Sequence, residues 1–174
     1  MTEIKDLRGF ISALDSAGQL VKVANPVSIE YELADVGASI ARENKGACLF
    51  ENVQDSPWPI FCGGVTSHSR AAVALNCEPS EVADTMEKAL DPSNGIAPVR
   101  IEKAAWHDNN LSGSDIDLKN LPILTHSRGD SGPFITGAVT ISKDPISGRG
   151  NLSYNRMSKL DKNILGFNVN EWRD

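Results

Sequence analysis

The sequence predicts an α+β protein in two parts, a small N-terminal α+β domain of residues 1–95 and a strand-rich region of residues 96–174. Apolar residues recur at helical spacing through much of the first part, whereas the second part holds short apolar, β-branched runs bounded by turn residues. The composition changes at about residue 91, where a loop with proline, glycine and asparagine begins. A chain of 174 residues, 40% of them hydrophobic, is long enough to form a real core.

Helices and strands alternate along the first part. Helical spacing of apolar residues predicts helices over residues 6–17, 29–43, 69–76 and 79–90. The apolar stripe of the second helix consists of Ile29, Leu33, Val36 and Ile40. Short apolar runs predict strands over residues 19–24, 47–53 and 59–65, the last two forming a pair. These stripes and runs are core positions, and no cofactor role is needed to explain them.

A hairpin is predicted in the second part. Residues 134–142 are apolar and β-branched and predict one strand, and residues 143–150 carry proline and glycine at positions that reverse a chain. The chain from Asn151 on should therefore return antiparallel to the first strand.

The return strand carries the residues with the most evident chemistry. Period-two alternation places Asn151, Ser153 and Asn155 on one face, and Leu152, Tyr154 and Arg156 on the other. A carboxamide oxygen such as that of Asn151 suits a hard divalent cation, and the fork of Arg156 suits a carboxylate or phosphate. The alternative is an edge hairpin whose polar side chains are simply solvated.

Charge and cysteine content exclude several classes of protein. The net charge is −6 with no cluster of Lys and Arg, which argues against a nucleic-acid partner. No apolar stretch approaches membrane-spanning length, and the N-terminus lacks the pattern of a signal peptide. Cys48, Cys62 and Cys77 are odd in number and lack metal-ligand spacing, so we interpret them as buried free thiols. We therefore expect a cytoplasmic protein.

Several short motifs occur in the order found in one enzyme family. The motifs are Asp6-Leu7-Arg8 with Phe10-Ile11, Gly18-Gln19-Leu20, Leu49-Phe50-Glu51-Asn52-Val53, Leu121-Pro122-Ile123-Leu124, Gly129-Asp130-Ser131-Gly132-Pro133-Phe134-Ile135-Thr136, Lys143-Asp144-Pro145 and Asn151-Leu152-Ser153-Tyr154-Asn155-Arg156. In this order they resemble the UbiD family of decarboxylases. Several ordered motifs across almost the whole chain are more specific than any one of them.

The resemblance implies both a fold and a chemistry. Family members use prenylated flavin mononucleotide (prenylated FMN), with a divalent metal such as Mn or Mg and often potassium. With these cofactors they remove or add the carboxylate of aromatic, heteroaromatic or α,β-unsaturated acids. Residues 96–174 would then be the first strands of a split β-barrel that binds the flavin. The expected substrate is a small-molecule carboxylic acid.

Individual residues acquire roles through the same resemblance. Asn151 matches a metal ligand, and Leu152 matches a residue whose backbone carbonyl binds potassium. Ser153 and Tyr154 match residues that lie against the flavin. On the partner strand Thr136 matches a flavin contact, although a threonine there is equally explained as an ordinary strand former.

Arg156 matches the arginine that works with catalytic glutamates beside the substrate carboxylate. The resemblance also implies what the chain lacks, because full-length members continue for a few hundred residues that supply a metal-binding His and Glu and the catalytic glutamates. We therefore expect no activity from the isolated chain. We also expect it to form a homo-oligomer or to pair with a complementary C-terminal chain. The alternative is a non-catalytic binding or assembly module that kept the fold and lost the site.

Overall fold

The computed structural model describes residues 4–169, and the chain forms two compact units. The first unit holds the described residues up to Asn25, with Val36–Asn52 and Pro59–Asn110. The second unit holds Pro26–Asp35, Val53–Trp58 and the described residues from Leu111 on. The predicted α+β class is confirmed, and none of the sheets formed by the described residues closes into a barrel. None of the helices in residues 4–169 is long and apolar enough to cross a membrane.

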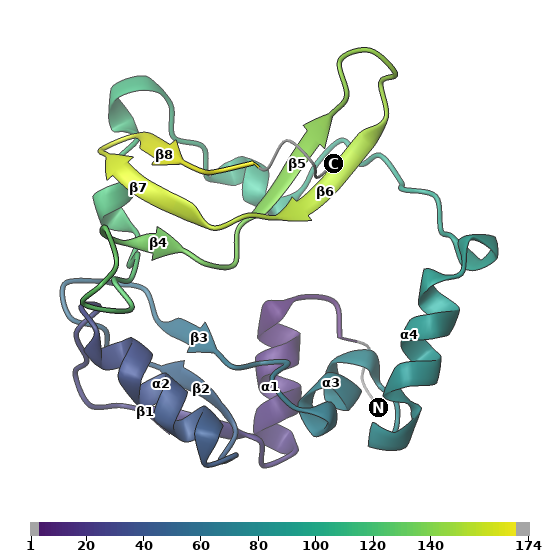
Figure 1. The fold of residues 1–174 in the computed structure, drawn as a ribbon, viewed down its shortest axis with the longest axis horizontal. Helices are drawn as coiled ribbons and strands as arrows, with labels where there is room; N and C mark the ends of the chain where they lie inside the picture. Colours follow the sequence, from purple (N-terminus) through teal and green to yellow (C-terminus); the bar gives the residue numbers. More distant parts are fainter. Residues whose placement is uncertain (1–3, 170–174) are drawn as a thin grey trace. The chain divides into compact units, whose positions relative to one another are not determined.

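A three-stranded sheet lies at the centre of the first unit (Figure 1). It contains β1 (Leu20–Val23), β2 (Ala47–Phe50) and β3 (Ile60–Cys62) in the order β1-β2-β3. The strand β2 runs parallel to β1 and antiparallel to β3. The three strands predicted in the first part are confirmed, as is the pairing of the last two, although β2 and β3 each end three residues earlier than predicted. Parallel strands need a crossover, which α2 (Glu32–Arg42) supplies between β1 and β2.

The first helix, α1 (Leu7–Ser16), begins and ends on local signals. The Asp6 side chain accepts a hydrogen bond from the Gly9 amide at 2.7 Å, which caps the first turn. The chain leaves the helix through Gly18, whose φ of +67° is easily adopted without a side chain. The predicted helix over residues 6–17 is confirmed.

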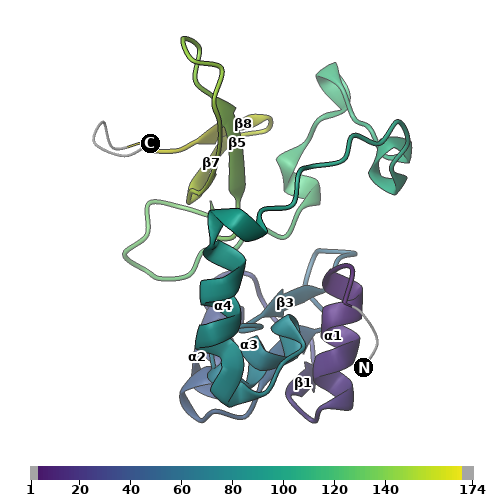
Figure 2. The same ribbon diagram turned by 90° about the vertical axis from the view of Figure 1, so that its right-hand side faces the viewer.

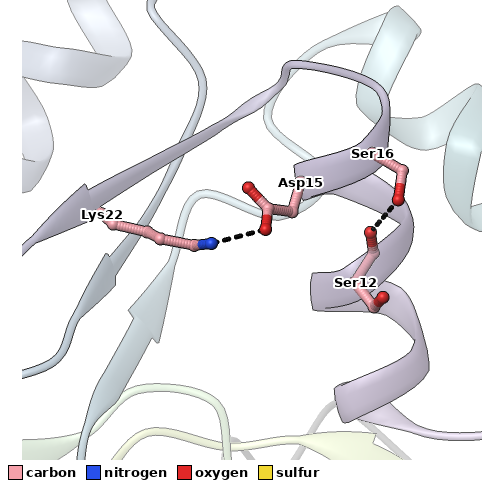
Figure 3. Close-up of polar contacts among 4 residues, drawn as sticks. All are labelled: Ser12, Asp15, Ser16 and Lys22. Atoms are coloured by element: carbon pink, nitrogen blue, oxygen red, sulfur yellow. Dashed lines mark hydrogen bonds and ion pairs between the residues drawn. The ribbon is translucent and has the colours of Figure 1, made fainter.

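An ion pair joins the end of α1 to β1 (Figure 3). Lys22 Nζ lies 2.5 Å from Asp15 Oδ2, while Ser16 Oγ donates to the Ser12 carbonyl at 2.9 Å within the helix. The hydrogen bond and the negative charge of Asp15 raise the pKa of Lys22. Both side chains of the pair are about half exposed, so its contribution to stability is small.

The second helix begins three residues later than the sequence predicts. Ile29 lies before α2 in a segment that pairs with Thr125: the Thr125 amide donates to the Ile29 carbonyl at 3.2 Å, and the Tyr31 amide donates to the Thr125 carbonyl at 2.9 Å. Tyr31 then has a φ of +67°, which is outside the helical region. The predicted first turn is therefore wrong, because pairing with a distant residue replaces the first helical hydrogen bonds.

The core of the first unit is small and well covered. Leu14, Ala47, Cys48 and Phe50 are 0–1% exposed. α2 approaches the sheet at Gly37, where an added Cβ would lie 3.0 Å from Cys62 Sγ. A larger residue at this position would require the Cys62 side chain to move by a few tenths of an ångström.

Two further helices complete the first unit (Figure 2). α3 (His68–Leu75) packs against α1 and against α4 (Val82–Leu90), which follows a single 3-10 turn. Arg70 of α3 is 2% exposed, and its guanidinium donates to the Gly63 carbonyl at 3.0 Å and to Thr66 Oγ1 at 2.7 Å. This buried arginine therefore fixes the loop between β3 and α3.

The three cysteines are free, as the sequence predicts, but they are not equally buried. Cys48 is buried, whereas Cys62 and Cys77 are partly exposed. Cys48 and Cys62 lie opposite each other on β2 and β3. Burial raises the pKa of Cys48 to about 12, so this thiol is a core group with little thiolate at neutral pH.

The second unit has its own small core, which includes residues from the N-terminal half. Val27, Val53 and Ile123 are 3–8% exposed. Val27 and Val53 form a parallel bridge, and the amide of Gln54 donates to the Val27 carbonyl at 2.9 Å. Two segments that precede residue 60 thus fold with the strands of the second part.

Two separate sheets form the rest of the second unit. β4 (Phe134–Ile135), β7 (Met157–Asp161) and β8 (Ile164–Gly166) form one sheet in the order β4-β7-β8. β5 (Val139–Lys143) and β6 (Gly150–Tyr154) form the other. The single strand predicted over residues 134–142 is therefore wrong, because β4 and β5 pair with different partners and residues 136–138 leave the ladder between them.

Candidate functional site

The predicted hairpin is confirmed as β5–β6. It is antiparallel, with Ser142 opposite Asn151 and Lys143 opposite Gly150. Asp144 holds the connecting turn, because its Oδ1 accepts hydrogen bonds from the amides of Ile146 at 3.0 Å and Ser147 at 2.5 Å. The bonds from the Ser147 amide and hydroxyl are the main cause that lowers the pKa of Asp144.

The two faces of the hairpin differ in chemistry and in exposure. Residues directly opposite each other in an antiparallel pair point to the same side of the sheet. The polar face therefore contains Thr140, Ser142, Asn151 and Ser153, and the apolar face contains Val139, Ile141, Leu152 and Tyr154. On the apolar face, Ile141, Leu152 and Tyr154 are 81%, 68% and 81% exposed, whereas Asn151 and Ser153 are partly buried. This inverts the usual arrangement, in which the apolar face is the covered one.

The polar face holds a buried hydroxyl without a partner. Thr140 Oγ1 is buried and, within residues 4–169, it has no hydrogen-bond partner. Ser153 lies opposite Thr140, but its Oγ donates to Asn155 Oδ1 at 2.8 Å. An unsatisfied buried hydroxyl costs about 1–3 kcal/mol, so it marks a position where a further polar group would be stabilising.

Asn151 lies at the end of the hairpin nearest the turn, in a cavity of about 370 Å³. Its side chain makes no hydrogen bond to a described residue. Lys143 and Arg149 line the same cavity. Neither residue was predicted from the sequence, although a hairpin closed by the Asp144 turn brings residues on either side of that turn together.

The remaining predicted residues lie elsewhere. The guanidinium of Arg156 lies over the ring of Phe134, 5.4 Å from its centroid, in a cation–π contact between the β6–β7 connection and β4. Thr136 is exposed in the bend after β4 rather than in a strand. The structure therefore brings Asn151 and Ser153 to one face, leaves Leu152 and Tyr154 on the other, and places Thr136 and Arg156 outside β5 and β6.

No complete metal site occurs in residues 4–169. No group of three or more His, Cys, Asp and Glu side chains there is arranged to hold a metal ion. The polar face of the hairpin offers hydroxyl and carboxamide groups but no carboxylate. A divalent cation, which takes about six oxygen or nitrogen ligands, therefore does not fit this face by itself.

Two descriptions of one protein family match the chain. Residues 11–90 match the 3-octaprenyl-4-hydroxybenzoate carboxy-lyase N-terminal domain. Residues 98–174 match the 3-octaprenyl-4-hydroxybenzoate carboxy-lyase Rift-related domain. Both are domains of UbiD.

Solved structures of UbiD-class enzymes resemble the chain closely. HmfF from Pelotomaculum thermopropionicum, in complex with FMN, is 27% identical with a TM-score of 0.81, and the match covers 95% of this chain and 37% of HmfF. An evolved dimeric form of HmfF, solved with prFMN, matches with a TM-score of 0.79. The apo 3,4-dihydroxybenzoic acid decarboxylase from Klebsiella pneumoniae is 27% identical with a TM-score of 0.80, over 98% of this chain and 38% of that one.

A two-chain enzyme shares the fold. The vanillic acid decarboxylase of Sedimentibacter hydroxybenzoicus, in its open form with one truncated chain, has a TM-score of 0.83 at 24% identity. That match covers 95% of this chain and 36% of the other. The chain thus spans somewhat more than a third of the length of each of these relatives. The matches to both domains, together with this likeness over almost all its length, show that the chain belongs to the UbiD family.

Proposed function

We propose that this chain takes part in UbiD-type reversible (de)carboxylation of an aromatic, heteroaromatic or α,β-unsaturated carboxylic acid, as the part that presents the β5–β6 hairpin to prenylated FMN. One observation carries the proposal: the hairpin shields a polar face with a free Asn151 side chain and an unpartnered Thr140 hydroxyl, and exposes its apolar face. A strand pair that only completed a core would do the reverse. The bound flavin would supply the acceptor for the electron pair released when CO₂ leaves.

The groups present fit a flavin better than they fit a metal. Flavin mononucleotide offers phosphate and ribityl oxygens and ring carbonyls, which suit the hydroxyl of Thr140, the amide of Asn151 and the cations of the turn. Asn151 would supply one metal ligand, and the others would have to come from outside residues 4–169. The proposed roles of Leu152, whose carbonyl would bind potassium, and Tyr154, a flavin contact, depend on whatever covers the exposed face.

Arg156 is proposed to hold the substrate carboxylate. Phe134 supports one face of its guanidinium, which leaves the edge with the N–H groups available for a bidentate contact. Thr136, two residues after Phe134, would contact the flavin from the same side. A carboxylate held in this way is oriented for loss as CO₂, but the reaction also needs an acid that supplies a proton.

The acid and the other metal ligands are proposed to come from a complementary polypeptide or C-terminal segment. The relatives of known structure are about two and a half times as long, and the apolar face of the hairpin is exposed. We therefore propose that the isolated chain has no decarboxylase activity and that it either forms a homo-oligomer or binds such a partner. The break between the two family matches supports the proposed division into residues 1–95 and 96–174. The free cysteines support the proposed cytoplasmic location.

The experiment separates the cofactor role from the substrate role. The chain, alone and co-expressed with a complementary UbiD-class C-terminal segment, would be titrated with prenylated FMN and Mn²⁺, and the flavin spectra and initial rates would be measured. Asn151→Ala should weaken metal-dependent flavin binding. Arg156→Ala should largely spare flavin binding and lower the rate several hundredfold, which corresponds to about 3–4 kcal/mol of barrier. His126→Ala, remote in sequence from both residues, is the control and should change neither quantity.

Normal turnover by Arg156→Ala with the cofactor bound would contradict the assigned role of Arg156. The second candidate function is a non-catalytic assembly module, favoured by the exposed apolar side chains of β5 and β6. It predicts that the chain binds the complementary segment but takes up no flavin, whether or not Asn151 is intact.

A further inference from the structure

Two of the three cysteines lie opposite each other in the first sheet. Cys48 of β2 and Cys62 of β3 are direct partners in an antiparallel pair, so their side chains lie on the same side of the sheet. That side faces α2, because a Cβ added to Gly37 would lie 3.0 Å from Cys62 Sγ and 3.9 Å from the Phe50 ring. Both thiols therefore lie in the layer between the strand pair and the helix.

The register brings these two cysteines within reach of a disulfide. The amides of Ala47 and Glu51 donate toward β1, at 2.9 Å and 3.0 Å from their acceptors, so alternation directs the backbone groups of Cys48 toward β3. Opposed residues of this hydrogen-bonded kind have Cα atoms about 5.5 Å apart, within the range of about 4.4–6.8 Å found for disulfides. Their Cβ atoms are somewhat farther apart than in a relaxed disulfide, so the bond would need a small shift of the strands and would be readily reduced.

The two thiols differ in their access to solvent. Cys48 is 1% exposed, whereas Cys62 is partly exposed. Burial raises the pKa of both thiols, to about 12 for Cys48, while a hydrogen bond with Cys48 partly offsets this effect at Cys62. Cys62 is therefore the thiol that an oxidant reaches first, and Cys48 is placed beside it as the resolving thiol.

We propose that Cys48 and Cys62 form a reversible disulfide when the protein meets a peroxide. The Cys62 sulfur attacks one peroxide oxygen, the O–O bond breaks, and Cys62 becomes a sulfenic acid. The Cys48 sulfur then attacks the Cys62 sulfur, and the hydroxyl leaves with the Cys48 proton as water. With hydrogen peroxide, two thiols are oxidised to one disulfide while the peroxide is reduced to two waters. A thiol such as reduced glutathione reverses the step by exchange.

Oxidation of this pair would reach the loop after β3. Gly63 follows Cys62 directly, and its carbonyl accepts the 3.0 Å hydrogen bond from the Arg70 guanidinium. The same guanidinium donates to Thr66 Oγ1 at 2.7 Å. A shift of Cys62 toward Cys48 therefore changes the position of a loop that the buried arginine holds in place, and the redox state of the sheet is transmitted to α3.

Mass spectrometry and thiol counting test the pair in the full chain. After treatment of the reduced protein with hydrogen peroxide, two of its three thiols should disappear, and the mass should fall by about 2 Da, the two hydrogen atoms removed. Glu51 lies between the two cysteines, so the fragments cut behind it should stay joined until a reductant is added. Reduced glutathione should restore all three thiols. NMR of the oxidised chain should show amide shifts that extend from Cys62 to Arg70.

Three variants separate the pair from ordinary oxidation. Cys77→Ser is the matched control, because it removes the cysteine outside the sheet, and it should form the disulfide to the same extent as the parent chain. In Cys62→Ala, the buried Cys48 should keep its thiol at the same peroxide dose. In Cys48→Ala, Cys62 should stop at the sulfenic acid, which dimedone traps and which the parent chain does not accumulate.

The mapping in the parent chain decides the outcome even if Cys48→Ala fails to fold. Retention of all three thiols, a cross-link that includes Cys77, or addition of oxygen to Cys62 without a disulfide would each overturn the inference. Loss of the disulfide in the Cys77→Ser control would also overturn it, because the cross-link would then depend on a residue outside the pair.

Discussion

The strand β2 and one face of the hairpin β5–β6 both carry apolar side chains, but these side chains have opposite environments. In β2, Ala47, Cys48 and Phe50 are at most 1% exposed, because β2 lies between β1 and β3 and α2 approaches the sheet closely at Gly37. In the hairpin, Ile141 and Leu152 are 81% and 68% exposed. Within residues 4–169, neither of these two strands pairs with a third strand. The first sheet is covered by other segments of its own chain, whereas residues 4–169 leave the apolar face of the hairpin exposed.

The buried side chains of β2 stabilise the fold, whereas the exposed side chains of the hairpin are available for binding. A buried apolar side chain stabilises the fold by about 1.5–3 kcal/mol, whereas an exposed one contributes little until something covers it. A two-stranded hairpin alone is at best marginally stable in water. The hairpin therefore depends on its turn, on neighbouring segments and on whatever binds to it, and this dependence can be tested residue by residue.

The largest expected effect is on the core of the first unit. Phe50→Ala should lower the free energy of unfolding by about 3–5 kcal/mol, because it leaves a cavity between the sheet and α2. The matched change on the hairpin, Ile141→Ala, should alter it by no more than about 0.5 kcal/mol. Urea unfolding followed by circular dichroism measures both. Similar losses of unfolding free energy in the two variants would mean that the apolar face of the hairpin is covered in solution. The proposed difference between β2 and the hairpin would then be wrong.

The next effect concerns the buried guanidinium of Arg70. Arg70→Lys should cost about 2–3 kcal/mol of unfolding free energy, because an ammonium cannot reproduce the two contacts to the Gly63 carbonyl and Thr66 Oγ1. The control is Arg42→Lys at the exposed end of α2, which should be neutral. The same urea titration is used, and a neutral Arg70→Lys would show that burial rather than hydrogen bonding holds this loop.

A smaller effect is expected on association. Replacing Ile141 and Leu152 together by threonine keeps the preference for a strand but removes apolar surface, so self-association should weaken about tenfold or more. Sedimentation velocity at micromolar concentration would measure this. Ile96→Thr is the control, because Ile96 is 95% exposed but lies outside the hairpin. If only the control variant dissociates, the interface is elsewhere; a strictly monomeric parent chain would contradict the expected association.

The smallest effect is local and depends on pH. Hydrogen bonds from Ser147 lower the pKa of Asp144 in the folded turn. Their contribution to stability is therefore present above the usual aspartate pKa and is lost as the pH falls through the lowered value. The amide shifts of Ile146 and Ser147 should titrate together in this acidic range by NMR. Asp144→Asn, which cannot titrate, should abolish the transition, and its persistence in that variant would assign it to another group.

The sequence predicted the elements whose signals are local. The capping Asp6 and the terminating Gly18 define α1, and apolar runs bounded by turns define β1, β2 and β3. The turn around Asp144 was also evident, and it fixes the antiparallel return of β6. Ordered motifs identified the family, because each is a short stretch that can be recognised without knowing its partners. Asn151 and Arg156 were selected in the same way, and their roles remain proposals.

By itself, then, the sequence determined the α+β class, the order of the helices and strands in the first part, and the family. Only the tertiary structure decided which surfaces are covered. Pairing with Thr125 moved the start of α2 to Glu32, and different partners for β4 and β5 divided a continuous apolar run. The turn of the hairpin then brought Lys143, Arg149 and Asn151 to the lining of one cavity, and the apolar side chains of the hairpin stayed exposed. The physical reason is that propensity and turn chemistry act over a few residues, whereas burial, strand pairing and charge clustering depend on segments that are distant in the chain.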